Sequence, residues 1–170
     1  MDIAAANGHL AVVKWLHFNR PEGCTIAAMN KAASHGHIDV VQWLHSNRTE
    51  GCTTKAMDKA ASNNHLEVLE WLHANRSEGC TKVAIEEALG SGYLQVVCWL
   101  REHYPKLKPT TVDHPIQNPN SFETLLFLHL FYQSLITPRF LENTLEMLGY
   151  MDEHTLDTHI RRWLEAKYLD

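Results

Sequence analysis

The sequence contains no apolar segment long enough to cross a bilayer, which takes about 18 residues or more. The N-terminus also shows neither a basic leader nor the apolar core of a signal peptide. We therefore expect a cytoplasmic or nuclear protein with no membrane partner.

Cysteine is scarce, and its spacing argues against a disulfide framework. Of the four cysteines, Cys24, Cys52 and Cys80 follow one another at intervals of 28 residues. Stacked repeat units would hold these positions a repeat's width apart, which is too far for a disulfide bond. Reduced thiols are predicted.

The chain has no excess of basic residues and no common catalytic motif. It carries 15 Lys and Arg against 20 Asp and Glu, for a net charge of −5, so it has no general attraction for nucleic acid. No Gly-rich phosphate loop, nucleophile elbow or paired-carboxylate motif is present. We expect a non-catalytic protein with no cofactor and no small-molecule substrate.

The sequence does contain a fixed period. Trp15, Trp43, Trp71 and Trp99 are each 28 residues apart, and the surrounding residues keep the same step. A period of about 20 to 50 residues is typical of a solenoid of stacked units. We predict an array over residues 1–104, with units near 1–20, 21–48, 49–76 and 77–104.

Each unit has the pattern of two helices. In the third unit, Thr53 is a suitable N-cap for a first helix with an apolar alanine stripe, and the helix ends at Asn63 and Asn64. In the preceding unit, His35 and Gly36 occupy the positions of these two asparagines. Both pairs predict a left-handed helix terminus. A second, more apolar helix follows, from Leu66 to about Asn75.

The segments Gly23 to His45 and Gly51 to His73 share the pattern GCTxxAMxxAASxxHLxVVxWLH with small changes. This pattern resembles the ankyrin repeat over residues 1 to about 104. The resemblance implies an all-α solenoid that binds proteins. The unit is shorter than the family's roughly 33 residues, so we expect its projecting β-hairpins to be trimmed. Met1 falls where other units are mid-helix, which predicts a longer natural array or a shortened gene model.

Two sets of recurring side chains are predicted to be structural. The tryptophans are expected between units, with a partly exposed aromatic ridge as the alternative. Zinc needs about four ligands around one centre, and one histidine per unit does not supply them, so no metal site is expected. Instead, His9, His37 and His65 are expected to hydrogen-bond the turn backbone between helices.

The polar positions opposite the alanine stripe of each first helix are candidate partner-binding residues, because the units differ there. They change from basic to acidic along the array, and the resemblance implies that this side is the concave, partner-binding surface. The set is Asn30, Lys31, Lys55, Asp58, Lys59, Lys82, Glu86 and Glu87.

The sequence changes character after the array. Residues 105–120 are rich in proline and read as a connector. Residues 121–170 predict a three-helix module, with helices from Ser121, from Pro138 to Leu148, and from Asp152 to the C-terminus. Residues 137–170 are similar to the helix-turn-helix core of winged-helix domains, so a DNA-associated factor is an alternative to a protein scaffold. The acidic last helix, despite Arg161 and Arg162, does not favour nucleic acid.

Overall fold

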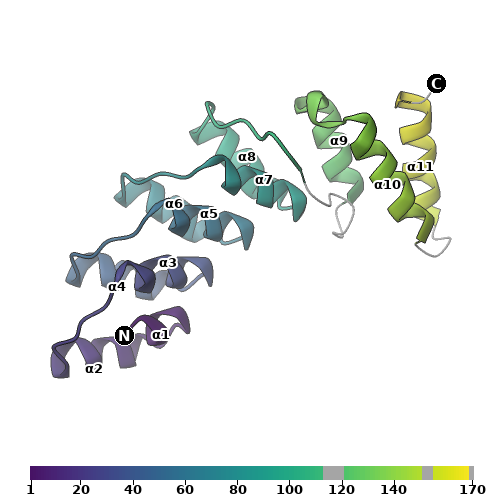
Figure 1. Ribbon diagram of the computed structural model, residues 1–170. Helices are drawn as coiled ribbons and strands as arrows, with labels where there is room; N and C mark the ends of the chain where they lie inside the picture. Colours follow the sequence, from purple (N-terminus) through teal and green to yellow (C-terminus); the bar gives the residue numbers. More distant parts are fainter. Residues whose placement is uncertain (113–120, 151–154, 169–170) are drawn as a thin grey trace. The chain divides into compact units, whose positions relative to one another are not determined.

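The computed structural model describes residues 1–112, 121–150 and 155–168; at 147–150 and 155–158 only the backbone is described. Every regular element in these residues is helical (Figure 1). The first helices of the four units are α1 (Asp2–Ala6), α3 (Ile26–Ser34), α5 (Thr54–Ser62) and α7 (Lys82–Gly90). The second helices are α2 (Leu10–Asn19), α4 (Ile38–Asn47), α6 (Leu66–Asn75) and α8 (Leu94–His103). The remaining elements are α9 (Ser121–Phe131), the 3-10 helix η1 (Gln133–Leu135), α10 (Pro138–Tyr150) and α11 (Thr155–Tyr168).

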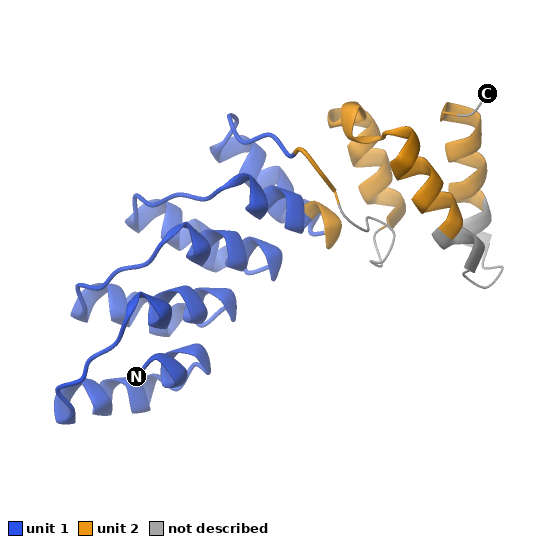
Figure 2. Cartoon of the chain, in the orientation of Figure 1, with its two compact units in different colours: residues 1–88, 93–109 blue, residues 89–92, 110–170 orange. Residues whose placement is uncertain are grey.

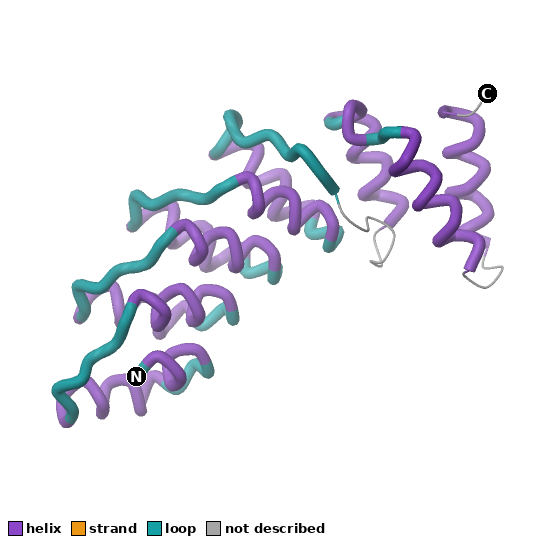
Figure 3. Tube along the Cα trace, in the orientation of Figure 1, coloured by secondary structure: helices purple, strands orange, loops and turns teal. Residues whose placement is uncertain are grey.

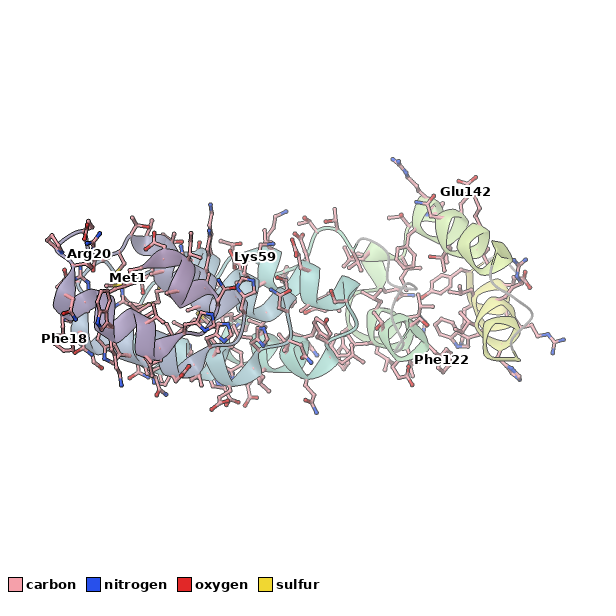
Figure 4. All side chains as sticks on the ribbon, turned by 90° about the horizontal axis from the view of Figure 1, so that it is seen from below. Met1, Phe18, Arg20, Lys59, Phe122 and Glu142 are labelled. Carbon is pink, nitrogen blue, oxygen red and sulfur yellow. The ribbon has the colours of Figure 1, made fainter. Side chains whose placement is uncertain are left out.

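The helix pairs of the array stack in chain order. Helix α3 packs against both α1 and α5, and α4 packs against α2, so first and second helices form two layers. The loops between units run along one edge of the stack, and the short turns within units lie at the other (Figure 3). These loops contain no strand in the described residues, in agreement with the trimmed hairpins that the short repeat predicts.

Small residues allow the first helices to approach closely. Ala28, Ala32 and Ala33 of α3 are each at most 1% exposed, and their counterparts in α5 are fully buried. The second helices fill the space between the layers with larger side chains such as Val41 and Leu44, also buried. The apolar stripe predicted from the sequence is therefore the core of the stack.

Threonine starts the first helices and a left-handed residue ends them, as the sequence predicts. The hydroxyl oxygen of Thr53 accepts a hydrogen bond from the Lys55 amide at 3.3 Å, which makes Thr53 the N-cap of α5. The turns after α3 and α5 place Gly36 at φ +76° and Asn64 at φ +62°. Glycine and asparagine tolerate this region best, which explains their presence there.

The chain divides into two compact units, residues 1–88 with 93–109 and residues 89–92 with 110–170 (Figure 2). The C-terminal one of these two parts has an apolar core of its own, and its fully buried side chains are Leu125, Leu128, Ile160 and Leu164. Thr137 caps α10, since its hydroxyl accepts a hydrogen bond from the Phe140 amide at 3.2 Å.

Two helix boundaries predicted for the C-terminal part of the chain differ from the structure or lie outside the described residues. Helix α10 continues through Gly149 to Tyr150, so the predicted end at Leu148 is wrong by two residues. The predicted start of the last helix at Asp152 lies outside the described residues, and the described helix begins at Thr155. No helix in the described part of the chain is long and apolar enough to span a membrane.

Candidate functional site

Threonine caps also join neighbouring units. The Asp58 carboxylate accepts hydrogen bonds from the Thr81 amide at 2.7 Å and the Thr81 hydroxyl at 2.9 Å. Asn30 makes the same pair of contacts with Thr53, at 3.0 Å each, its amide nitrogen donating to the hydroxyl. Asp2 does so with Thr25. Each first helix therefore fixes the start of the next one.

This arrangement corrects part of the predicted partner-binding set. Asp58 is only 7% exposed, so its placement on an open surface is wrong. Burial is the main cause that raises the pKa of its carboxyl group, and the hydrogen bonds from Thr81 oppose that rise. Asn30 is half-buried and uses both polar atoms of its side chain on Thr53. Neither side chain is available to a partner without breaking a contact between units.

In two of the loops between units, an arginine reaches back to the preceding unit. Arg48 forms an ion pair with Glu50, and its Nη1 lies 3.4 Å from His17 Nδ1 in the preceding unit. An added Cβ at Gly23, where φ is +68°, would lie 2.6 Å from Arg48 Nη2, so the arginine covers this glycine. The hydrogen bond from Arg48 lowers the pKa of Glu50.

The next unit repeats this arginine contact, with Arg76 paired to Glu78, covering Gly51 and lying near His45. The equivalent pair at the start of the array, Arg20 and Glu22, is exposed on both sides, at 58% and 64%. These arginine contacts were not identified from the sequence, although the 28-residue spacing of Arg20, Arg48 and Arg76 was a usable signal.

The histidine that follows each interhelix turn packs on the corresponding turn of the preceding unit. An added Cβ at Gly8 would lie 2.6 Å from Nδ1 of His37, and one at Gly36 would lie 2.6 Å from Nδ1 of His65. Burial, followed by the nearby His35 and His37, lowers the pKa of His65. His9, which has no turn before it in this chain, is exposed.

The tryptophans differ by position. The rings of Trp43 and of His17 in the preceding unit form a T-shaped pair with centroids 5.2 Å apart, and Trp71 and His45 form the same pair. Trp99 meets His73 at 5.4 Å. These three indoles are half-buried between units, whereas Trp15 is 58% exposed and contacts no earlier unit.

The thiols of Cys24, Cys52 and Cys80 are poorly suited to nucleophilic chemistry. Burial raises the pKa of Cys24 and Cys52, and it raises that of Cys80 to about 12. A thiol reacts as the thiolate, and these groups are held in the neutral form. Among the residues that the structure describes, no group of three or more His, Cys, Asp or Glu side chains could hold a metal ion.

The exposed part of the predicted partner-binding set lies along the first helices and consists mainly of lysines. Lys59 lies 3.4 Å from Glu87 of the next unit, and Lys82 lies 3.5 Å from Glu86, whose side chain is only 14% exposed. Lys31 and Lys55 are exposed and form no ion pair within the described residues. The predicted change from basic to acidic is therefore largely neutralised by pairing at its acidic end.

Apolar side chains lie on the same surface, and the sequence interpretation missed them. Ile26 and Val83, in the first turns of α3 and α7, are 46% and 36% exposed. We call the exposed residues of the first helices the first-helix side, and its members are Ile3, Ile26, Lys31, Lys55, Lys59, Lys82, Val83 and Glu87.

The second helices expose the opposite charge. Lys14 is their exposed lysine, and it is outnumbered by four exposed acidic residues, Asp39, Glu67, Glu70 and Glu102. We call this set the second-helix side. The array therefore has a basic surface on one helix layer and an acidic surface on the other, and the net charge of the chain does not reveal this difference.

In the C-terminal unit, the two arginines considered for DNA contact have different surroundings. Arg161 is half-buried and donates a hydrogen bond from Nη2 to the Leu145 carbonyl at 3.1 Å. Arg162 is exposed. One of the two guanidinium groups thus contributes to the packing of α11 on α10.

Comparison with known proteins identifies the array. A family model described as ankyrin repeats (many copies) matches residues 1–45, 31–73 and 57–101. No curated protein and no solved structure gives a significant match.

Proposed function

The chain belongs to the ankyrin-repeat family, and on that premise we propose that its array is a non-catalytic scaffold that binds a protein partner on the first-helix side. Ankyrin repeats generally mediate protein–protein interaction. The observation that carries the choice of surface is the coexistence of exposed apolar side chains, Ile26 and Val83, with the unpaired Lys31 and Lys55. Protein interfaces combine an apolar centre with a polar rim, and this surface has side chains of both kinds.

The contacts between units support the same choice. Side chains that recur in three of the four units, such as Thr53, Arg48 and His65, are used to hold neighbours together. The residues of the first-helix side differ from unit to unit and carry little of that packing. They can therefore determine which partner binds without changing the fold.

A partner selected from a displayed peptide library against the intact chain provides the test. Reversing Lys55 and Lys59 to Glu should weaken its binding by about tenfold or more and flatten the salt dependence. The far-ultraviolet circular dichroism of the variant should not change, because both lysines are exposed.

The matched control changes two exposed charges on the other helix layer, Glu67→Gln with Glu70→Gln. Binding should be the same as for the unchanged chain. If the lysine variant bound normally and this control variant lost binding, the second-helix side would be the interface and the proposal would be wrong.

A further inference from the structure

The two helix layers of the array differ in the sign of their exposed charge. The first-helix side has four lysines and one exposed glutamate, whereas the second-helix side has one lysine and four acidic residues. The whole chain carries −5, so an acidic molecule is repelled at long range. At physiological salt the Debye length is only about 8 Å, and the nearest charges dominate once a partner is close.

Pairing leaves two of the four lysines without a neutralising acid. Lys59 and Lys82 pair with Glu87 and Glu86, while Lys31 and Lys55 have no ion-pair partner among the described residues. These two lie on adjacent helices, α3 and α5, which pack against each other. Together they form an uncompensated positive patch on the first-helix side.

The position of Lys55 adds to this charge. It occupies the first turn of α5, directly after the N-cap residue Thr53 and Thr54. The N-terminal end of a helix is the positive end of its dipole, so a lysine there is disfavoured unless an anion is near. Lys82, the first residue of α7, also lies in the first turn of its helix, but Glu86 compensates it.

We propose that the partner of the first-helix side is an acidic peptide segment with apolar residues, whose carboxylates lie beside Lys31 and Lys55. This inference rests on the proposed function above. The apolar residues of the segment would contact Ile26 and Val83, which flank the lysines in the first turns of α3 and α7. The acidic second-helix side would repel the same segment, so the charges also orient its approach.

A random peptide library without charge bias, displayed on phage and selected against the full chain, tests this inference. Enriched peptides should carry a net negative charge. For a synthetic peptide from that pool, the double variant Lys31→Gln with Lys55→Gln should reduce the association rate by roughly tenfold at low salt. The matched control, Lys14→Gln with Lys106→Gln, makes the same change in net charge at two exposed lysines elsewhere and should leave the rate unchanged.

A second variant of the same surface changes only its apolar residues, Ile26→Ser with Val83→Ser, and leaves its charges in place. It separates this inference from the proposed function. If the enriched peptides were neutral or basic and did not bind this variant, the inference of an acidic partner would be wrong, and the first-helix side would remain the interface. Peptides whose binding is unaffected by every first-helix variant would overturn the proposed function and, with it, the acidic partner.

Discussion

At the scale of single residues, the same side chain has different roles in different units. The indole of Trp43 contacts His17 of the preceding unit, while Trp15 occupies the same repeat position and is 58% exposed. Val12 and Val40 differ in the same way, at 47% and 0% exposed. A repeat position therefore contributes to stability only where a neighbouring unit covers it.

Replacing Trp43 by Ala should lower the free energy of unfolding by roughly 2 to 4 kcal/mol, because it removes a large half-buried side chain from a contact between units. The matched change Trp15→Ala should cost less than about 1 kcal/mol. Urea unfolding followed by circular dichroism measures both. Equal losses for the two variants would show that the contact with His17 contributes nothing special to stability.

The contact between Asp58 and Thr81 provides a test with a built-in control, because Asn30 makes the same contact one unit earlier. Asp58→Asn should keep both hydrogen bonds, whereas Asp58→Ala should lower the free energy of unfolding by about 1 to 3 kcal/mol, because the amide and the hydroxyl of Thr81 lose their hydrogen bonds to Asp58.

The pH dependence of Asp58 has a definite sign. In the folded state, the pKa of the Asp58 carboxyl group is raised above the ordinary value of 3.8. The protonated carboxyl group therefore stabilises the fold, and this stabilisation is fully present below pH 3.8. It is lost as the pH rises through the folded-state pKa. Asp58→Asn should remove this loss, so the variant should gain stability relative to the unchanged chain between acidic and neutral pH. Parallel unfolding curves across that range would contradict the prediction.

At the scale of an element, the interhelix turn combines a backbone requirement with a contact to the next unit. Gly36 has φ +76°, and the ring of His65 fills the space where a Cβ would lie. The third unit has Asn64 in the same turn position and Tyr93, instead of histidine, one unit later. Where the turn residue changes from glycine to asparagine, the residue at the histidine position of the next unit therefore changes from histidine to tyrosine.

Gly36→Ala should lower the free energy of unfolding by about 1 to 3 kcal/mol, through left-handed strain and the displacement of His65. Removing the ring with His65→Ala relieves the second part but not the first. A double-mutant cycle measured by thermal unfolding should therefore show the two changes together costing less than their sum. Additive losses would mean that the ring does not restrict the turn.

At the scale of the whole molecule, a stacked array should not be equally stable along its length. Helix α5 lies between neighbouring units, whereas α1 packs on the array from one side, against α3. Amide hydrogens of Ile3 to Ala6 should exchange at least about tenfold faster than those of Ala60 and Ala61. Exchange measured by mass spectrometry or NMR checks this, and equal protection would contradict the expected gradient.

The features that could be predicted from the sequence depend on local chemistry repeated at one period. The cap at Thr53 and the left-handed residues at Gly36 and Asn64 are determined by neighbouring residues, and repetition made them easier to recognise. The alanine stripe was correctly predicted as core for the same reason.

The features that were missed involve residues of different units. Asp58 reads as a surface residue of α5, and only its bond to Thr81, 23 positions later, explains its burial. The pairing of Lys59 with Glu87 likewise spans 28 positions and alters the predicted charge gradient. A helical period shows which side of a helix is apolar, but it does not show which polar groups a neighbouring helix will bind.

The contacts to Thr53 and Thr81, and those of Arg48 and Arg76, are chemically almost the same at each junction. A junction with such uniform chemistry cannot recognise which unit comes next, so only the covalent chain determines the order of the units. During refolding, non-consecutive units and units of separate molecules present compatible surfaces to one another. Correct assembly therefore depends on the short loops, because they bring consecutive units together before more distant ones can meet.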